Sequence, residues 1–368
     1  MPFLLREHPG QLPTLLPGLF RSILRAPLGV RRAIGAGNRR LSYPSSPQFR
    51  DGLFHNRQPM QVVESGSRTS MARDFATKGR SGRPSTPVEV VTPELPAQAA
   101  DLGVTWLGHA TVLLEVDGRW VLTDPVWSDR VSPSESVGPR RNHPVPMAVA
   151  DLPDLDAVLI SHDHYDHLDT ATIDALVSGQ DVPFVVPLGI GVHLARWGVP
   201  ADRIIELDWH QSHDVSGLRL TCTEARHFSG RFLGGNTTLW SSWVVAGERT
   251  RVFFGGDSGY TPSYVDIGAA HGPFDLTVLP IGAYDERWRD VHMDPAEAVQ
   301  AHAELRGDIL LPIHWATFDL AFHTWAAPAD WVLEEAADRG VRLAIPRPGE
   351  RVTAGGGLPV SPWWRASA

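Results

Sequence analysis

The stretch DAVLISHDHYDHL, residues 156–168, decides how this chain is interpreted. It begins with Asp156–Ile160, a short, mostly apolar run of the kind that forms a buried strand. Four metal-ligand side chains follow directly, at the point where that strand should end: His162, His164, Asp166 and His167. Imidazole and carboxylate groups are ligands that Zn²⁺ prefers. The stretch therefore predicts a metal site on a loop at the edge of a sheet.

So short a segment does not easily give all four donors to one ion, whereas two adjacent ions can share them. His162 and His164 are two residues apart and project the same way from an extended backbone, so we expect them on one ion. Asp166 and His167 lie where the chain turns toward a helix beginning near Thr170, and we expect them on the other. A histidine-rich surface loop without metal is the alternative.

Three further donors argue against that alternative, because each follows a strand candidate later in the chain. They are His227, Asp257 and His314. The glycine pair before Asp257 lets the backbone approach closely. Each of the three alone would more often be a structural residue. Together with the first four they provide three ligands for each of two ions and one carboxylate to bridge them.

Composition narrows the class of protein. The chain has 368 residues, of which 42% are hydrophobic, so it can bury a sizeable core in one large or two modest domains. Its net charge of −9 argues against a general nucleic-acid binder. Cys222 is the only cysteine, which excludes an internal disulfide and a thiolate zinc site. We expect a cytoplasmic protein whose metal is held by histidine and carboxylate.

The charge is distributed unevenly along the chain. Residues 1–83 contain 14 Lys and Arg against 4 Asp and Glu, whereas the remainder carries a net charge of −19. Gln11–Val30 shows a short basic amphipathic pattern, with Arg21 and Arg25 on the same face, typical of helices that lie in a membrane surface. A disordered arginine-rich arm is the alternative. No apolar stretch approaches the roughly 18 residues of a transmembrane helix.

Strand and helix patterns begin only near residue 103. Short β-type runs dominate at first, and helical patterns alternate with strands afterwards, which predicts an α/β fold. We divide the chain into a basic, Pro/Gly-rich arm and linker over residues 1–100, a folded metal-binding domain over 101–350 and a C-terminal tail over 351–368.

Several segments also resemble a known family. The His-x-His-x-Asp-His pattern, with a later His, Asp and His at strand ends, resembles the metallo-β-lactamase fold superfamily of binuclear hydrolases. Neighbouring segments between about Val104 and Phe318 narrow the resemblance to the N-acyl-phosphatidylethanolamine-hydrolysing phospholipase D family. Those segments are Val104-Thr-Trp-Leu-Gly-His-Ala-Thr-Val, Leu122-Thr-Asp-Pro, Gly138-Pro-Arg-Arg, Ile205-Glu-Leu-Asp-Trp, Gly272-Pro-Phe-Asp-Leu, Pro280-Ile-Gly-Ala-Tyr and Ile313-His-Trp.

The resemblance implies a four-layer α/β/β/α sandwich with two Zn²⁺ ions between the strand-end loops. Carried over by position, one ion is held by His162, His164 and His227, the other by Asp166, His167 and His314, and Asp257 bridges them. The implied reaction is hydrolysis of N-acyl-phosphatidylethanolamine to phosphatidate and N-acylethanolamine. A hydroxide that bridges the two metals is the expected nucleophile.

Residues near the metals receive expected roles in that reaction. Asp166 is expected to help orient or deprotonate the water as well as to hold zinc. His292 matches a family histidine near the metals, and we expect it to give a proton to the leaving group or to bind phosphate. Arg140 and Arg141 are expected to bind the substrate phosphate, which arginine contacts through two hydrogen bonds, and Tyr165 is also expected to bind substrate. An ordinary solvated loop with surface arginines is the alternative.

Other functions stay open. Asp163, Glu135-Ser136 and Val291 depart from the mammalian enzymes, which puts the head-group preference in doubt. A soluble hydrolase of the same fold, acting on another phosphodiester or a sugar-phosphate lactone, is the alternative. A diiron oxidoreductase is disfavoured because that branch usually has Glu where His164 stands, and a non-catalytic scaffold because no ligand is missing. Expected partners are a phospholipid substrate and an anionic membrane surface, to which the protein would bind peripherally. Nucleic acid is not an expected partner. A homodimer stays open.

Overall fold

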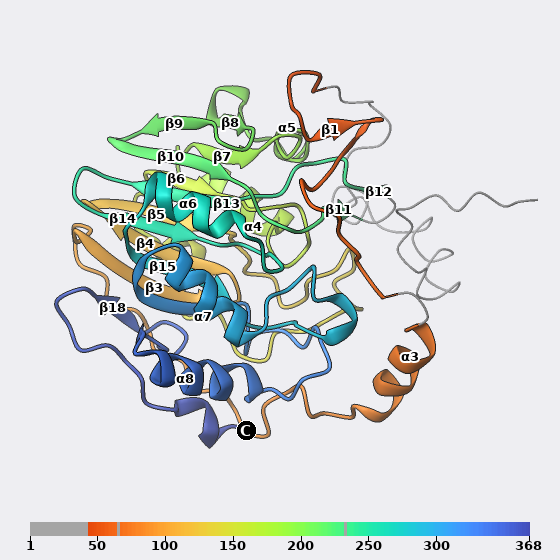
Figure 1. The fold of residues 1–368 in the computed structure, drawn as a ribbon. Coiled ribbons are helices and arrows are strands. Elements are labelled where there is room, and N and C mark those ends of the chain that lie inside the picture. The colour runs from red at the N-terminus through yellow and green to blue at the C-terminus, as the bar shows by residue number, and fades with distance from the viewer. Residues whose placement is uncertain (1–42, 65–66, 232–233) are drawn as a thin grey trace, which may run out of the picture.

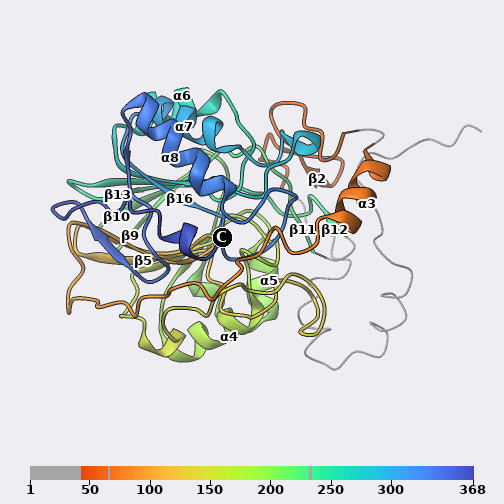
Figure 2. The same ribbon diagram turned by 90° about the horizontal axis from the view of Figure 1, so that it is seen from below.

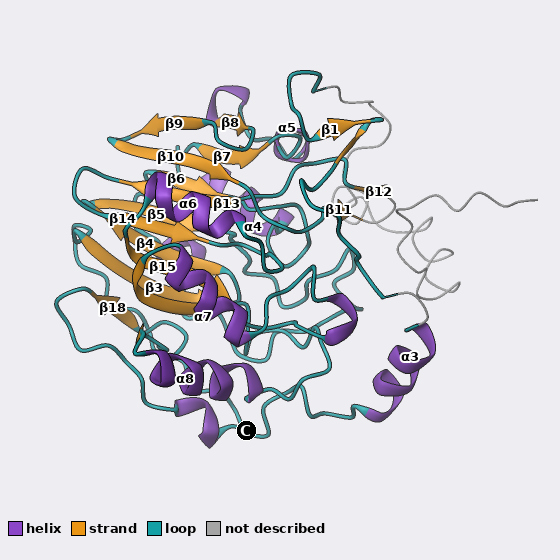
Figure 3. Ribbon diagram, viewed as in Figure 1, coloured by secondary structure: helices purple, strands orange, loops and turns teal. Residues whose placement is uncertain are grey.

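The computed structural model describes residues 43–64, 67–231 and 234–368. The amphipathic pattern predicted over Gln11–Val30 lies outside the described residues. Two seven-stranded sheets face each other, and helices cover both outer faces (Figures 1 and 3). Among the helices of the described part, none has the length and apolar character needed to cross a bilayer.

The first sheet has the strand order β18-β3-β4-β5-β6-β7-β8. Its strands are β3 (Leu102–Gly108), β4 (Thr111–Val116), β5 (Arg119–Thr123), β6 (Ala157–Leu159), β7 (Phe184–Pro187), β8 (Ile204–Leu207) and β18 (Arg351–Thr353). The strands from β18 to β5 pair antiparallel, and those from β5 to β8 pair parallel. Helices α4 (Thr170–Gly179) and α5 (Gly191–Arg196) pack on its outer face.

The second sheet has the order β17-β16-β15-β14-β13-β10-β9. Its strands are β9 (Ser212–Val215), β10 (Leu218–Thr223), β13 (Ser242–Ala246), β14 (Arg251–Phe254), β15 (Phe274–Pro280), β16 (Gly307–Ile313) and β17 (Arg342–Leu343). The helices α6 (Ser263–His271), α7 (Pro295–Glu304) and α8 (Ala327–Arg339) lie on the side away from the first sheet (Figure 2). Figure 2 therefore shows the four layers α/β/β/α that the resemblance implied.

Shorter elements complete the described chain. They are the strands β1 (Phe49–Arg50), β2 (Leu53–Phe54), β11 (Gly230–Arg231) and β12 (Gly234–Gly235), the helix α3 (Arg68–Thr77), and four 3₁₀ turns at Val149–Asp151, Ala201–Arg203, Glu286–Trp288 and Trp363–Ala366.

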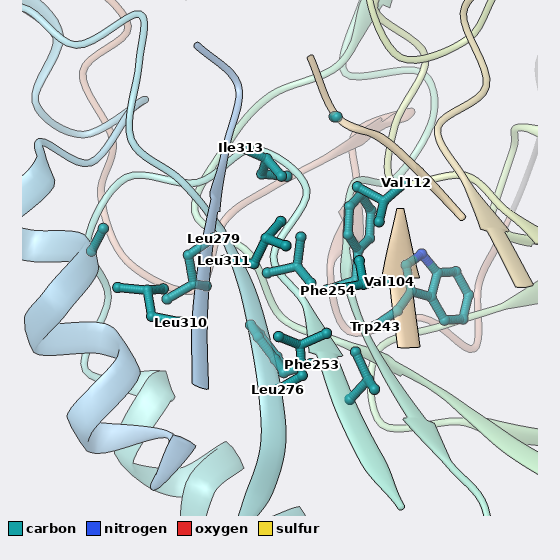
Figure 4. Close-up of a cluster of buried hydrophobic side chains, with 14 of the residues drawn as sticks. Val104, Val112, Trp243, Phe253, Phe254, Leu276, Leu279, Leu310, Leu311 and Ile313 are labelled. Atoms are coloured by element: carbon teal, nitrogen blue, oxygen red, sulfur yellow. The ribbon is translucent and has the colours of Figure 1, made fainter. Parts of the chain in front are cut away.

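Alternation along the strands explains why both faces of each sheet are apolar. In β6, Ala157 and Leu159 belong to the main core, whereas Val158 belongs to the cluster under α4 and α5. Strands buried on both faces read as continuous hydrophobic runs, which is how the run before the histidines appears in the sequence. Figure 4 shows the main core, where Val104 of the first sheet lies among residues of the second, including Trp243.

Two segments that we placed outside the domain are packed into it. The predicted tail contains β18, which pairs with β3, and Trp364, which is fully buried. The predicted linker contains Phe54, which is fully buried in the main core, and the helix α3. These segments therefore provide an edge strand and core side chains to the sandwich, and the division of the chain at residues 100 and 350 stays a prediction.

Arg351 provides a test of the contribution of this C-terminal strand. The Glu115 carboxylate is fully buried and accepts hydrogen bonds from Arg351 Nε at 2.6 Å and Nη2 at 2.8 Å. Replacing Arg351 by methionine leaves a buried carboxylate without its cation, so we expect a loss of about 3–5 kcal/mol in unfolding free energy. Chemical denaturation measures this loss. Adding Glu115→Leu should restore most of it, and an unchanged midpoint for Arg351→Met would contradict the prediction.

Candidate metal centre

The predicted ligands come from loops that follow strands of both sheets. The loop after β6 carries His162, His164, Asp166 and His167, while His227, Asp257 and His314 follow β10, β14 and β16. β10, β14 and β16 run in the same direction, so their carboxyl ends lie at one edge of the second sheet. The structure brings all seven predicted ligands together there, most of them deeply buried.

One group of three imidazoles forms half of the centre. His162 Nε2 lies 2.8 Å from His164 Nδ1, and His227 Nε2 lies 3.4 Å from the same atom. The three rings meet edge to face, with centroids 4.5–5.1 Å apart. Three nitrogens converging from two loops form the three-histidine set that we predicted for one ion.

The second group contains Asp166, His167 and His314. Asp166 Oδ2 lies 3.6 Å from both His167 Nε2 and His314 Nε2. Asp166 is the most accessible of the three, with 16% of its side chain exposed, whereas the rings are almost completely buried. The second group therefore combines one carboxylate with two imidazoles, and a third imidazole, that of His109, belongs to the same cluster.

Asp257 lies between the two groups. Its Oδ2 is 3.2 Å from His167 Nε2 and 3.7 Å from His227 Nε2, and its Oδ1 is 3.1 Å from His314 Nε2. Gly256 precedes it with φ +57°, and a Cβ there would lie 2.6 Å from Ser161 Cβ. Glycine is therefore required at this close approach of two ligand loops. One carboxylate thus contacts both groups, which is the position of a bridging ligand.

Unpartnered polar atoms show that these residues fit a metal. His167 Nε2, His314 Nε2 and Asp257 Oδ1 are buried and have no hydrogen-bond partner. Buried polar atoms without partners are costly in a protein interior. These three atoms point toward one shared centre but do not form hydrogen bonds with one another. A cation bound at that centre would coordinate all three and remove the cost of leaving them unpartnered.

Hydrogen bonds behind the rings orient several of these atoms. His167 Nδ1 lies 2.7 Å from Asp124 Oδ2, and His227 Nδ1 lies 3.1 Å from the carbonyl oxygen of Val291. A ring that donates from Nδ1 keeps Nε2 free of a proton and available to a metal. Both rings therefore present Nε2 to the centre.

The charges also favour a bound cation. Burial would raise the pKa values of Asp166 and Asp257, but His167 and the other surrounding histidines hold both well below the usual range. Burial would likewise lower the pKa of His167, yet the carboxylates of Asp257, Asp166 and Asp124 raise it well above its usual value. The buried carboxylates therefore require positive charge nearby. Protonated imidazoles provide that charge when no metal is bound, and bound metal ions take over this role.

Sequence reasoning assigned no role to two residues that belong to this network. Asp124 accepts hydrogen bonds from Ser161 N at 2.6 Å and Ser161 Oγ at 2.5 Å in addition to facing His167, so it ties the start of the ligand loop to the end of β5. His109 lies in the β3–β4 turn with φ +54°, and its Nε2 is 2.9 Å from Asp166 Oδ2. Both residues lie in sequence segments that resemble the phospholipase D family, and that resemblance was the only sign in the sequence that they could matter.

The His109–Asp166 contact gives a prediction. His109→Ala removes the hydrogen bond that holds the Asp166 carboxylate, and loss of such an outer partner lowers metal affinity or activity by about 10- to 100-fold. His109→Gln retains a side-chain N–H and should stay within about threefold of the parent protein. Zinc content and kcat at saturating zinc measure the effect. The assignment is wrong if the alanine and glutamine variants both match the parent protein.

The structure also places the residues predicted to act on substrate. His292 lies beside the centre, with Nδ1 3.8 Å from Asp257 Oδ2 and buried without a hydrogen-bond partner. The Tyr165 ring lies under the Arg231 guanidinium, 4.0 Å from ring centroid to Cζ, and the buried Tyr165 hydroxyl has no hydrogen-bond partner. Their catalytic and substrate-binding roles stay predictions.

The two arginines differ from each other. Arg141 is nearly buried, and its Nη2 donates to the carbonyl oxygen of Val126 at 2.6 Å, so it holds its own loop together. Arg140 is largely exposed and pairs with Asp129 at 2.8 Å. Both side chains have protein partners, and their contact with a substrate phosphate stays a prediction. Asp163, one of the departures noted above, accepts a hydrogen bond from Gly230 N at 2.6 Å and does not belong to either ligand group.

Comparisons with known proteins agree with this geometry. The sequence profile of the beta-lactamase superfamily domain matches residues 119–315. An uncharacterized protein of Mycobacterium tuberculosis (strain H37Rv) is 50% identical over 351 residues, covering 93% of this chain and 94% of its own length. The N-acyl-phosphatidylethanolamine-hydrolyzing phospholipase D 1 of Caenorhabditis elegans is 40% identical over 246 residues, covering 64% of this chain and 69% of its own.

Solved structures support the fold. Igni18, a metallo hydrolase from the archaeon Ignicoccus hospitalis, superposes with a TM-score of 0.54 at 22% sequence identity, covering 70% of this chain and 99% of its own. The profile match, the four layers and the metal-ligand cluster agree with one another. The chain therefore belongs to the beta-lactamase superfamily, as a hydrolase of the metallo-β-lactamase fold with N-acyl-phosphatidylethanolamine-hydrolyzing phospholipase D among its relatives.

Proposed function

We propose that the protein is a zinc-dependent phosphodiesterase of the phospholipase D type that hydrolyses N-acyl-phosphatidylethanolamine to phosphatidate and N-acylethanolamine. The observation that carries this proposal is that the carboxylate of Asp257 contacts both the three-histidine group, at His227, and the Asp166 group, at His167 and His314. The 40% identical relative in Caenorhabditis elegans, whose name states this reaction, supports the choice of substrate.

The ligand set explains the choice of metal and its number. Five imidazoles and two carboxylates, without thiolate, suit Zn²⁺, and their division into two groups suits two ions. Two Zn²⁺ ions held there would supply Lewis-acid catalysis and activate water at neutral pH.

The protein's own groups then orient the reactants and move protons. In the reaction, the water oxygen bonds to phosphorus, the bond from phosphorus to the ethanolamine oxygen breaks, and the leaving oxygen takes a proton. Asp166, held by His109, orients the water and accepts its proton. His292, whose Nδ1 lies 3.8 Å from Asp257 Oδ2 and whose ring stacks on that of His314, gives a proton to the leaving oxygen.

A panel of phospholipids tests the substrate. Purified protein is assayed on N-acyl-phosphatidylethanolamine, phosphatidylethanolamine, phosphatidylcholine and a water-soluble aryl phosphodiester, with zinc supplied and after chelation. We expect zinc-dependent release of N-acylethanolamine at a rate above that for the other lipids. Cleavage of the soluble diester without cleavage of N-acylated lipid would instead favour the soluble hydrolase considered above.

We also propose that residues 1–42 dock the protein on an anionic membrane surface. These residues lie before the first described residue and contain most of the basic excess of the N-terminal part. Each Lys or Arg near an anionic lipid surface contributes about 1 kcal/mol of attraction. Deleting residues 1–42 should weaken sedimentation with phosphatidylserine liposomes at least about tenfold and leave hydrolysis of the soluble diester unchanged. Equal liposome binding by the full and truncated chains would exclude this role.

A further inference from the structure

We propose that Asn56 is a positioning residue for the metal ligand His227, so that residues 54–61, here called the strap, are part of the metal centre. The strap lies far outside the region matched by the family profile, which begins at residue 119. The proposal rests on the metal-binding part of the proposed function and does not depend on the substrate.

Asn56 pairs with both backbone groups of His227. Its Nδ2 donates to the His227 carbonyl oxygen at 2.7 Å, and its Oδ1 accepts from the His227 N–H at 3.2 Å. The same Oδ1 accepts from the indole Nε1 of Trp240, a fully buried residue, at 3.1 Å. The Asn56 amide is therefore held in one orientation while it holds the ligand.

The fold explains why His227 needs this partner. His227 lies between β10 and β11, where the backbone is not part of a sheet ladder. Buried peptide groups require hydrogen bonds, and here a side-chain amide supplies both of them, as a neighbouring strand would. The chain leaving β2 reaches this position because Phe54 N donates to the Asn236 carbonyl oxygen at 2.7 Å, beside β11 and β12 (Figures 1 and 2).

Further contacts join the strap to the loop that carries His292. Arg226 Nη2 donates to the Pro59 carbonyl oxygen at 2.9 Å and lies 2.8 Å from Asp290 Oδ1. The other oxygen of Asp290 accepts from Gln61 N at 2.9 Å. The next residue, Val291, accepts from the His227 ring.

Three segments distant in sequence thus meet around one imidazole. The strap fixes the backbone of His227, and the loop before α7 fixes its ring. His227 belongs to the three-histidine group, whereas no strap contact reaches Asp166, His167 or His314 among the hydrogen bonds of the described residues. A substitution at Asn56 should therefore lower the affinity for one metal ion more than the affinity for the other.

Two substitutions test this inference on the full chain. Asn56→Asp keeps the shape but replaces the donor with a carboxylate oxygen that faces the His227 carbonyl, and Asn56→Ala removes both hydrogen bonds. Zinc affinity is measured by competition with a chelator of known affinity. We expect the affinity for one of the two Zn²⁺ ions to fall about 10- to 100-fold in both variants, with the other within about threefold. A role in packing alone would spare Asn56→Asp.

Controls separate positioning from folding. Asp74→Asn removes a partly exposed ion pair between α3 and Arg287, beyond the strap, and should leave both affinities unchanged. Circular dichroism of the metal-free proteins identifies a variant that does not fold, and Asn56→Ser, which keeps a hydroxyl there, then replaces it in the titration. Wild-type affinity for both ions in the folded variants would overturn the inference. Absence of zinc binding by the unmodified protein would instead contradict the proposed function.

Discussion

Asp257→Ala is expected to lose bound metal and hydrolytic activity together. Asp257 contacts both groups, with its carboxylate 3.2 Å from His167 Nε2, 3.1 Å from His314 Nε2 and 3.7 Å from His227 Nε2. Removing a residue that only hydrogen-bonds a metal ligand already lowers metal affinity or activity by about 10- to 100-fold. Removing the shared carboxylate itself should therefore lower metal affinity by more than about 100-fold.

Metal analysis by mass spectrometry and turnover under saturating zinc measure this effect. Asp214→Ala is a suitable control because that carboxylate is largely exposed and lies on β9, outside both ligand groups. We expect the control to retain the metal content and activity of the parent protein. Two bound zinc ions with full activity in Asp257→Ala would remove the basis for a bridged centre.

Removal of zinc is expected to abolish hydrolysis and to lower thermal stability. Without metal, the buried carboxylates of Asp166 and Asp257 rely on protonated imidazoles for their positive charge. A ligand present at about 1,000 times its Kd stabilises the folded state by about 4 kcal/mol. For a domain of this size such a loss lowers Tm by roughly 10 °C.

The measurement compares calorimetric scans and turnover before chelation, after chelation and after zinc is restored. Zinc should recover both properties. Recovery with iron and not with zinc would point to the oxidoreductase class that we disfavoured from His164. Activity that persists in protein shown by metal analysis to be free of metal would contradict a metal-dependent mechanism.

The sequence predicted the core strands well because each is a short apolar run bounded by turn residues. The sequence shows short β-type runs over 111–116, 119–123, 204–207, 218–223 and 251–254, and these are the bounds of β4, β5, β8, β10 and β14. α6 was not expected, because its short segment contains Gly268 and lacks a strong apolar stripe. β18 was not expected because it is only three residues long and is followed by glycines.

The ligand set could be predicted for a similar physical reason. Each of the seven donors follows a strand, and the ends of parallel strands gather at one edge of a sheet. Residues that support the ligands lack such a pattern. His109 is a single histidine in a tight turn, and Asn56 lies 171 residues before the ligand it contacts, a pairing that only the folded chain brings together.

Arg141 shows why the role of a single side chain is hard to predict from sequence. Chemistry alone makes an arginine a good phosphate ligand, but burial decides whether its donors are available. Two of its donors point to backbone carbonyls of its own loop, and its guanidinium lies 5.0 Å from the centre of the Phe318 ring. The sequence does not show that an arginine donates its hydrogen bonds to the backbone of its own loop.

The division of the ligands between the two sheets has a mechanical consequence. The first sheet contributes His162, His164, Asp166 and His167, and the second contributes His227, Asp257 and His314, so each three-ligand group spans the sandwich. Cys222 is the only cysteine, and the chain therefore cannot join its halves by a disulfide. Metal bound at this centre would serve as a reversible cross-link between the halves, and its affinity would report how tightly they are clamped together.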